Sequence, residues 1–581
     1  MSDRKTGEET ENEVRRTGFL EGLYLDGFDE TRFKSLVPAG PDQKAVEIIR
    51  RYRELIKGHS PAALEKKGKI PDKLWDGLKE IGLFGLNIPE EYGGVGLTLA
   101  GYLSVLRDMA RTDMALALTP TAHLSIGLKG IILFGSEEQK KKYLTPAASG
   151  EMIFAYVLTE PKAGSDAQHI ETTAELSGDG THYILNGQKT YITNGGFAGG
   201  LTVFAQMDPE HPGFMGALIV ETAWDGVKVG REIPKMGLKI SSTTPISFDD
   251  VRVPVKNLLG QPGDGFKIAM TILNYGRLGL GAASVGAMEQ SVEDMMKRAT
   301  SRKQFGVPIR DFQLIQEKMV RARVHAFAAA SMTASTSRLL EEDPVGGMAM
   351  ESSHVKLYGT TRAWDTLYDA LQTAGGAGYL AVQPYEKRMR DFRVTTVFEG
   401  TTEIHSIYPA LSLMRALGKR LKESGRGRVG QAFYLLKEGL KCPSLRLRCK
   451  NGEMRRAAHT ARRNARAVRR MAHLGLLFYG KKITAKEFFL RRITYLSLDC
   501  YGLLAMLARI GDDQEKGRDV TESVHRLAYF NGEAMKAGKV NRRLFTRRSE
   551  RLHRDVYSDL LGAGDMKSEK PDNSPEDGGK E

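Results

Sequence analysis

The spacing of apolar residues changes twice along this chain, and the change limits the folds that it can adopt. Residues 42–157 place apolar side chains at helical spacing, as at Val46 and Ile49, which predicts a helical domain. Residues 158–262 instead hold short runs typical of β-strands, and helical spacing returns from Gly265. An α+β fold with a barrel-like β domain between two helical domains is therefore predicted.

The β-type runs are short, and one pair is separated by turn residues. Asn186 and Gly187 stand between two of them, and this dipeptide is the strongest short-range signal for a hairpin. A hairpin is predicted there. The runs occupy residues 183–185, 189–192, 201–205, 217–220 and 245–248.

The length of 581 residues exceeds what one hydrophobic core normally supports, so several domains are expected. Residues 422–427 (KESGRG) have the composition of a linker. The predicted parts are an N-terminal extension (1–41), a helical domain (42–157), a middle β domain (158–262), a helical bundle (263–412), a basic helical C-terminal domain (413–563) and a disordered tail (564–581).

The net charge of +14 is confined to the end of the chain. From residue 411 onward there are 38 Lys and Arg against 20 Asp and Glu, whereas the first 410 residues hold 47 bases and 51 acids. A basic C-terminal domain indicates an anionic partner surface.

Several classes of protein are excluded by composition. No run of 18 apolar residues occurs, so no membrane-spanning helix is predicted. The first twenty residues mix acids and bases without an apolar core, which argues against a secretory signal and makes the cytoplasm the expected location. The three cysteines (442, 449 and 500) match neither a disulfide framework nor a metal motif.

One carboxylate stands in an apolar turn rich in hydroxyl groups. Residues 390–403 (RDFRVTTVFEGTTE) place Glu399 beside Val397 and Phe398, and an apolar environment raises the pKa of a carboxyl toward neutrality. Glu399 is therefore a candidate general base. The alternative is a structural one, in which Glu399 caps the helix that begins near Thr401.

Two other polar residues invite a functional interpretation. Arg277 falls on the apolar face of the helix that starts at Gly265, and a buried guanidinium needs a ligand or an internal ion pair. His123 is expected to be a packing histidine.

Five motifs occur in one order across residues 42–410: 158–166 (LTEPKAGSD), 191–195 (YITNG), 302–306 (RKQFG), 372–376 (QTAGG) and 390–403. With the order helices, β domain, helices, they resemble the acyl-CoA dehydrogenase family. Residues 122–127 (AHLSIG) and 314–318 (LIQEK), with the long C-terminal domain, are most similar to its very-long-chain branch.

The resemblance implies an FAD-dependent enzyme of fatty acid β-oxidation that converts long-chain acyl-CoA to trans-2-enoyl-CoA and passes electrons to electron-transferring flavoprotein. Glu399 would remove the α-proton while the flavin accepts a hydride, and no metal is needed. The rival activity in the same fold is an acyl-CoA oxidase that uses oxygen. A DNA-binding or assembly-scaffold role is the alternative from another class.

The resemblance also assigns the remaining site residues. The flavin would contact Tyr156, Leu158, Thr159, Gly164, Ser165, Tyr191, Ile192 and Thr193. A homodimer partner would add Arg302, Gln304, Phe305, Phe312, Gln313, Gln372, Gly375 and Gly376, with Thr401, Thr402 and Glu403 completing the shell. Acyl-CoA would contact Ser165, Asn274, Arg277 and Gly400.

The basic C-terminal domain holds an arginine-rich helix followed by an apolar run. The arginines at 455, 462, 466 and 469 are spaced to share one helical face, and residues 474–479 (LGLLFY) follow. Such a pair suits an anionic membrane surface, which predicts peripheral binding at the inner face of the membrane. A solvated face, or one docked on the acidic catalytic part, is the other interpretation, and the lack of interleaved aromatic residues argues against nucleic acid.

Overall fold

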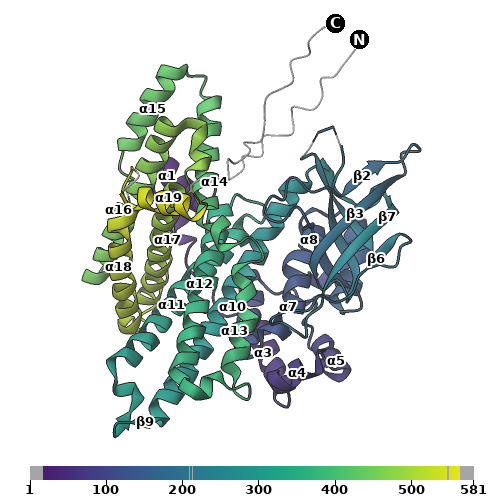
Figure 1. Cartoon of the computed structure of the whole chain (residues 1–581), viewed down its shortest axis with the longest axis horizontal. Helices are drawn as coiled ribbons and strands as arrows, with labels where there is room; N and C mark the ends of the chain where they lie inside the picture. Colours follow the sequence, from purple (N-terminus) through teal and green to yellow (C-terminus); the bar gives the residue numbers. More distant parts are fainter. Residues whose placement is uncertain are drawn as a thin grey trace.

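The computed structural model describes residues 17–562, except 209, 212, 444, 446, 546 and 547. Three bodies of secondary structure lie side by side (Figure 1): a sheet domain on the right, a central bundle of long helices, and the C-terminal helices on the left. The predicted disordered tail falls outside the described residues.

The N-terminal helical domain packs between the sheet and the central bundle. Its helix α9 begins with a capping box, in which the Ser136 hydroxyl accepts from the Gln139 amide N–H and the Gln139 side chain accepts from Ser136. Between α7 and α8 the chain forms a π-helical turn, His123–Gly127, and such turns often occur at functional sites. The helices are α3 (Gln43–Ile56), α4 (Pro61–Lys67), α5 (Asp72–Glu80), α6 (Leu99–Thr112), α7 (Met114–Ala122), α8 (Lys129–Phe134) and α9 (Glu137–Ala148).

An eight-stranded sheet forms the middle domain, and seven of its strands follow the order β6-β7-β3-β2-β4-β5-β8, with β1 pairing to β4. The first strand starts five residues before the predicted boundary at 157/158, because β1 pairs with β4 in parallel. The strands are β1 (Ile153–Val157), β2 (Thr173–Leu176), β3 (His182–Thr193), β4 (Ala198–Gln206), β5 (Met215–Glu221), β6 (Val227–Val229), β7 (Thr243–Pro254) and β8 (Leu258–Gly263).

The predicted hairpin at Asn186 and Gly187 is wrong. Strand β3 runs through both residues, and its register against β7 shifts between Leu185 and Gly187. Gly187 has φ 147°, and a Cβ there would lie 2.5 Å from the Thr172 hydroxyl. The dipeptide therefore forms a β-bulge, the other structure that a glycine inside a strand commonly indicates.

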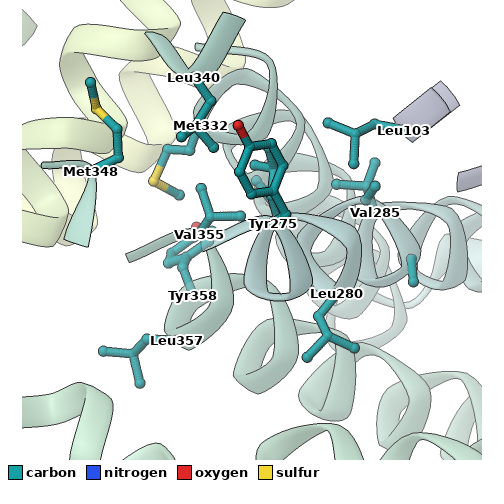
Figure 2. Close-up of a cluster of buried hydrophobic side chains, with 14 of the residues drawn as sticks. Leu103, Tyr275, Leu280, Val285, Met332, Leu340, Met348, Val355, Leu357 and Tyr358 are labelled. Atoms are coloured by element: carbon teal, nitrogen blue, oxygen red, sulfur yellow. The ribbon is translucent and has the colours of Figure 1, made fainter. Parts of the chain in front are cut away.

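The central bundle is built around α10, a helix of 37 residues that is buried for most of its length. Its apolar side chains meet those of α6, α11 and α12, as Figure 2 shows for Tyr275, Leu280, Met332 and Val355. The elements are α10 (Gly265–Ser301), β9 (Lys303–Gln304), β10 (Val307–Pro308), α11 (Gln313–Glu342), α12 (Ala349–Ala374), α13 (Pro384–Arg393) and α14 (Thr402–Glu423).

The last helix of the central bundle continues into the predicted C-terminal domain. Helix α14 crosses the expected boundary at 412/413 and ends at Glu423, because Leu413 and Leu417 continue its buried face. The non-helical residues 424–427 separate it from the next helix, within the predicted linker. The helices that follow are α15 (Arg428–Leu440), α16 (Gly452–Tyr479), α17 (Glu487–Glu515), α18 (Thr521–Asn541) and α19 (Arg548–Leu560).

The N-terminal extension packs against this C-terminal domain and the bundle. Its helices are α1 (Phe19–Leu25) and α2 (Glu30–Lys34). The Leu20 N–H donates to Glu351 of α12 at 2.6 Å, and the Tyr24 hydroxyl donates to Ser497 of α17 at 2.9 Å. The extension therefore joins two parts that are hundreds of residues away in the sequence.

In the part of the chain that the structure describes, two helical stretches are long and apolar enough to cross a membrane by length and composition. They are Met114–Phe134 and Glu487–Glu515, and 89% and 83% of their apolar windows are buried inside the fold. Burial in the protein core accounts for their apolar composition.

Candidate functional site

The turn that carries Glu399 connects α13 to α14 and has an unusual backbone. Glu399 has φ 57° and Gly400 has φ 92°; the left-handed conformation costs a non-glycine residue about 1–3 kcal/mol unless its surroundings enforce it. Here the His405 ring lies 2.9 Å from the Glu399 carbonyl through Nε2 and 2.6 Å from the Ser353 hydroxyl through Nδ1. Side chains from both α12 and α14 therefore hold the turn in place.

The Glu399 carboxylate points onto α10. Its Oε2 atom is buried and has no hydrogen-bond partner among the described residues. A Cβ added at Gly276 would lie 2.8 Å from this oxygen and 2.8 Å from the side chain of Ile126, in the π-helical turn. Gly276 thus provides the space that the carboxylate occupies.

The electrostatics of the turn favour proton transfer near neutral pH. Burial raises the pKa of Glu399 to about 7, and the charges of Arg277 and then Lys356 oppose that rise. Lys356 is itself buried and donates to the Gly400 carbonyl. Burial lowers the pKa of Lys356 to about 7, with the Glu399 carboxylate opposing the decrease. The carboxyl can therefore both lose and accept a proton near pH 7.

Arg277 and Asn274 lie one turn apart on α10, and both are buried. The Arg277 Nε and Nη1 atoms have no hydrogen-bond partner among the described residues, and its guanidinium lies 5.4 Å from the centre of the Tyr408 ring. Among the described residues, Arg277 therefore makes no internal ion pair. Asn274, by contrast, accepts from the Ser352 hydroxyl at 2.7 Å.

A first group of predicted flavin residues surrounds the edge of the sheet nearest Glu399. The Tyr156 hydroxyl donates to the Ala269 carbonyl of α10 at 3.4 Å. Burial and then the Glu399 carboxylate raise the pKa of Tyr156, and the charge of Arg277 opposes that rise. Tyr191 is 66% exposed at φ 57°, and nothing lies within 4 Å of a Cβ added at Gly164.

The rest of this group supplies backbone, hydroxyl and apolar groups. Thr159 accepts from the Thr190 N–H at 2.9 Å through its carbonyl, and Leu158 accepts from the Lys189 ammonium at 3.1 Å. Ser165 is exposed and Thr193 is half-buried, while Ile192 faces the sheet core. An exposed aromatic ring, open glycine backbone and neighbouring hydroxyls fit a flat ring with a polar edge, such as a flavin.

A second group lies at the opposite end of α10. At 1.5 Å per residue, a helix of 37 residues separates its two ends by about 55 Å. Arg298 donates to the Ala374 carbonyl at 3.3 Å, which holds the two segments of this group together. The group comprises Arg302, Gln304, Phe305, Phe312, Gln313, Gln372, Gly375 and Gly376.

The aromatic residues of the second group are open to solvent. Phe305 is 94% exposed at φ 51°, and its ring stands edge-on to Phe312 with the ring centres 6.1 Å apart. Because β9 and the sheet lie at opposite ends of the bundle (Figure 1), one chain does not bring the two groups together.

Thr401, Thr402 and Glu403 follow Glu399 directly. Thr401 caps α14 by accepting from the Ile404 N–H at 3.3 Å, and Thr402 donates to the Thr396 carbonyl at 3.3 Å. The predicted helix cap therefore exists, but Thr401 supplies it and Glu399 does not. Among the described residues no group of three or more His, Cys, Asp or Glu could hold a metal.

Four residues of this site were not predicted from the sequence: Gly276, Ser353, Lys356 and His405. Only Gly276 carries a local signal, because glycine inside a helix often marks close packing. The other three reach the turn through contacts that sequence spacing does not reveal: Lys356 lies 44 residues before Gly400, and Ser353 lies 52 residues before His405. His123, as expected, is a packing residue whose Nδ1 accepts from the Phe154 N–H at 2.9 Å.

Comparison with known proteins assigns this arrangement to a family. Three family models match in order: acyl-CoA dehydrogenase N-terminal domain at residues 43–151, middle domain at 155–251 and C-terminal domain at 263–410. The human very long-chain specific acyl-CoA dehydrogenase, a mitochondrial protein, is 35% identical over 83% of this chain and 76% of its own length. The chain belongs to the acyl-CoA dehydrogenase family.

Solved acyl-CoA dehydrogenases show which parts of the fold are shared. A Bacillus anthracis acyl-CoA dehydrogenase, crystallised with FAD, has a TM-score of 0.79 at 30% identity and covers 94% of this chain and 95% of its own. Butyryl-CoA dehydrogenase from Megasphaera elsdenii has a TM-score of 0.61 at 31% identity and covers 65% of this chain and all of its own. The enzyme is an FAD-dependent oxidoreductase, and its C-terminal helices are shared with the first of these relatives.

Proposed function

We propose that this acyl-CoA dehydrogenase oxidises long-chain acyl-CoA to trans-2-enoyl-CoA, with Glu399 as the base that removes the α-proton. The observation that supports the proposal is the buried, unpartnered Oε2 of Glu399, on a carboxyl whose pKa burial raises to about 7. FAD, when bound, supplies the acceptor for the hydride that leaves the β-carbon. The residues of the chain bind, orient and deprotonate the substrate.

Polar groups around Glu399 would position the thioester. The two unpartnered nitrogens of Arg277 can donate to an anion or a carbonyl. Gly400 offers its backbone beside the carboxylate, and Ser165 offers a hydroxyl group at the edge of the sheet. Asn274 offers its side-chain amide, which the Ser352 hydroxyl orients. Their proposed role is to contact the acyl-CoA.

The pH dependence tests the electrostatic part of this proposal. Replacing Lys356 by methionine removes a positive charge that lowers the pKa of Glu399, so the carboxyl should hold its proton to higher pH. We expect the rising limb of the kcat/KM profile to move upward by about one pH unit. The Lys356→Gln variant keeps a donor for the Gly400 carbonyl without the charge, so an equal displacement is expected. An unchanged profile in both variants would show that the charge does not act on the base.

The homodimer is proposed because the two flavin groups lie at opposite ends of one chain. In a dimer, the Arg302 group of one protomer would reach the Tyr191 group of its partner, and a guanidinium is suited to the pyrophosphate. Co-expression of Glu399→Gln chains with chains carrying Arg302→Ala and Phe305→Ala tests this. Each mixed dimer should contain one wild-type site out of its two, whereas sites built within one chain would give no flavin-dependent recovery.

The chain-length preference and the electron acceptor belong to the same proposal. The human relative is specific for very long chains by its name, and the proposed acceptor is electron-transferring flavoprotein. We expect kcat/KM to be highest for acyl-CoA of 14 carbons or more in a series from butyryl-CoA upward. Rapid peroxide formation after anaerobic reduction by palmitoyl-CoA and admission of oxygen would favour an oxidase instead.

Peripheral binding to the cytoplasmic face of a membrane is proposed through helix α15. The predicted apolar run at 474–479 offers little apolar surface, because Leu474 and Gly475 are buried in the fold and Phe478 is the one large residue of the run that is mostly exposed, at 55%. Helix α15 instead exposes an apolar stripe whose members are between 46% and 85% exposed: Val429, Phe433, Leu436 and Leu440. An apolar stripe beside basic residues suits an anionic lipid surface.

Point variants test the membrane proposal without removing the domain. Phe433→Ser with Leu436→Ser should abolish flotation with vesicles that contain phosphatidylglycerol, because the apolar stripe is interrupted at its centre. Leu176→Ser with Met236→Ser, on exposed residues of the sheet domain, is the matched control and should float as the wild type does. Flotation that survives the first pair would contradict the assignment of α15.

A further inference from the structure

The C-terminal domain contains a groove of about 460 Å³ whose walls carry four guanidinium groups. Three belong to α16, where Arg463, Arg466 and Arg470 follow at intervals of three and four residues and share one face. Arg542 faces them from the residue after α18. We call these four residues, with Ala467, Leu544 and the buried Met471 beside them, the arginine groove.

The exposed arginine-bearing face of α16 differs from the face that was predicted. The sequence grouped the arginines at 455, 462, 466 and 469, but Arg469 is buried. Its guanidinium donates to the Glu438 carboxylate and to the carbonyls of Tyr24 and Leu25, the latter two at 2.9 Å each. Arg469 therefore binds the N-terminal extension to α16. The solvent-exposed face of α16 is formed by other arginines, including Arg463, Arg466 and Arg470.

The arginine groove has no directly paired carboxylate among the described residues, and the one carboxylate charge that acts on Arg542 is that of Asp499, whose Oδ2 atom is buried. Elsewhere on α16, Arg456 pairs with Glu453 and Arg469 with Glu438. Among the described residues, none of the four groove arginines makes an ion pair with a carboxylate. Because a guanidinium stays charged at all physiological pH values, the groove favours an anion from outside the described chain.

One of the four arginines is oriented by a buried partner. The Nε and Nη2 atoms of Arg542 donate to the Asn464 side-chain carbonyl at 3.1 and 3.0 Å. Asn464 is fully buried, so its position is fixed by the packing of α16. Burial and then the charge of Arg463 lower the pKa of Arg542, and the Asp499 carboxylate opposes the decrease. A bound anion would relieve the repulsion between the two arginines.

The chemistry of the lining selects a class of anion. Guanidinium groups form paired hydrogen bonds with phosphate oxygens, and the half-buried Ala467 and Leu544 add an apolar surface beside them. A volume of about 460 Å³ also exceeds what one phosphate needs. We propose that the arginine groove binds a phosphate ester, with the phosphate between α16 and Arg542 and the carbon portion over Ala467 and Leu544.

The inference does not rest on the proposed dehydrogenation. Helices α16 and α18 lie on the far side of the bundle from the sheet (Figure 1), so the groove is separate from the sheet domain that carries the first flavin group. The phosphate ester could come from a lipid headgroup or from a soluble metabolite, and binding assays on the flavin-loaded full chain distinguish the two sources.

The experiment compares two triple variants that each lose three positive charges. The groove variant carries Arg463→Gln, Arg466→Gln and Arg470→Gln. The control carries Arg455→Gln, Arg462→Gln and Arg491→Gln, all exposed and outside the groove. Calorimetry with sn-glycerol 3-phosphate and flotation with phosphatidylglycerol vesicles are measured for the wild type and both variants at one fixed salt concentration.

We expect the groove variant to bind at least tenfold more weakly than the control in one arm or both. Loss confined to vesicles identifies a lipid headgroup, and loss with glycerol 3-phosphate identifies a soluble ester. Equal loss in the two variants would reduce the effect to general charge attraction and overturn the proposal, as would a wild type that binds neither probe. If the triple variant loses its flavin, Arg466→Gln alone is used, with a smaller loss in the same direction expected.

Discussion

Replacement of Glu399 by glutamine should reduce the turnover of palmitoyl-CoA by about 10²–10⁴-fold, the usual contribution of a positioned general base. The amide is almost isosteric with the carboxyl, so the turn held by His405 and Lys356 should persist. Acyl-CoA affinity and flavin content should therefore stay close to those of the wild type. Steady-state kinetics with the flavin spectrum recorded alongside measure both quantities.

The matched control for this variant is Glu423→Gln at the exposed end of α14. It makes the same chemical change in a carboxyl far from the turn, and its turnover should equal that of the wild type. If Glu399→Gln kept a turnover within tenfold of the wild type, the base would have to be another residue. Glu403 would then be the first candidate, because it follows in the same stretch.

The second large effect concerns the stability of the sheet domain that carries the first flavin group. Lys189 and Glu160 form a buried ion pair at 2.7 Å, with 0% and 2% of their side chains exposed. Lys189 also donates to the carbonyls of Leu158 at 3.1 Å and Phe204 at 2.7 Å. Burial lowers the pKa of Lys189 to about 8, and the Glu160 carboxylate opposes the decrease.

Removing only the carboxylate leaves this ammonium buried without a counter-charge. We expect Glu160→Leu to lower the free energy of unfolding by about 3–5 kcal/mol and to weaken FAD retention, because Leu158 and Thr159 belong to the same segment. Urea unfolding followed by flavin fluorescence measures both effects. The double variant Glu160→Leu with Lys189→Met should recover most of the loss, since both charges are then absent.

The surface pair Lys162 and Glu171 provides the control for this experiment. Both side chains are mostly exposed, at 77% and 61%, and solvent screens such pairs. Glu171→Gln should therefore hardly change the unfolding curve. If Glu160→Leu were equally harmless, the buried pair would contribute nothing to the domain.

The sequence predicted the part of the site that is continuous along the chain. The turn at 390–403 contained the carboxylate, its apolar neighbours and the helix start, and the prediction of a raised pKa for Glu399 agrees with the structure. Contacts between residues that are distant along the chain could not be predicted from the sequence. Nothing near Glu399 in the sequence indicates that Gly276 leaves room for its carboxylate or that Lys356 binds the Gly400 carbonyl.

The errors in the fold have the same origin. Asn186 and Gly187 have the local chemistry of a hairpin, but pairing with β7 keeps β3 continuous and turns the dipeptide into a bulge. On α16, helical periodicity placed Arg469 with the exposed arginines, whereas Glu438 and the N-terminal extension enclose it. Tertiary contacts decided both cases, and no local pattern contains them.

Anaerobic mixing of the flavin-loaded enzyme with palmitoyl-CoA, followed at the flavin absorbance over a range of pH, tests the role of Glu399 most directly. A base must be deprotonated to act, so the rate of flavin reduction should rise with pH through about 7, in line with the raised pKa of Glu399. In Glu399→Gln the flavin should be reduced at least about 10²-fold more slowly. The reduction rate of this variant should also no longer increase with pH. A glutamine variant that reduces the flavin at the wild-type rate with the same pH profile would contradict the assignment of Glu399 as the base.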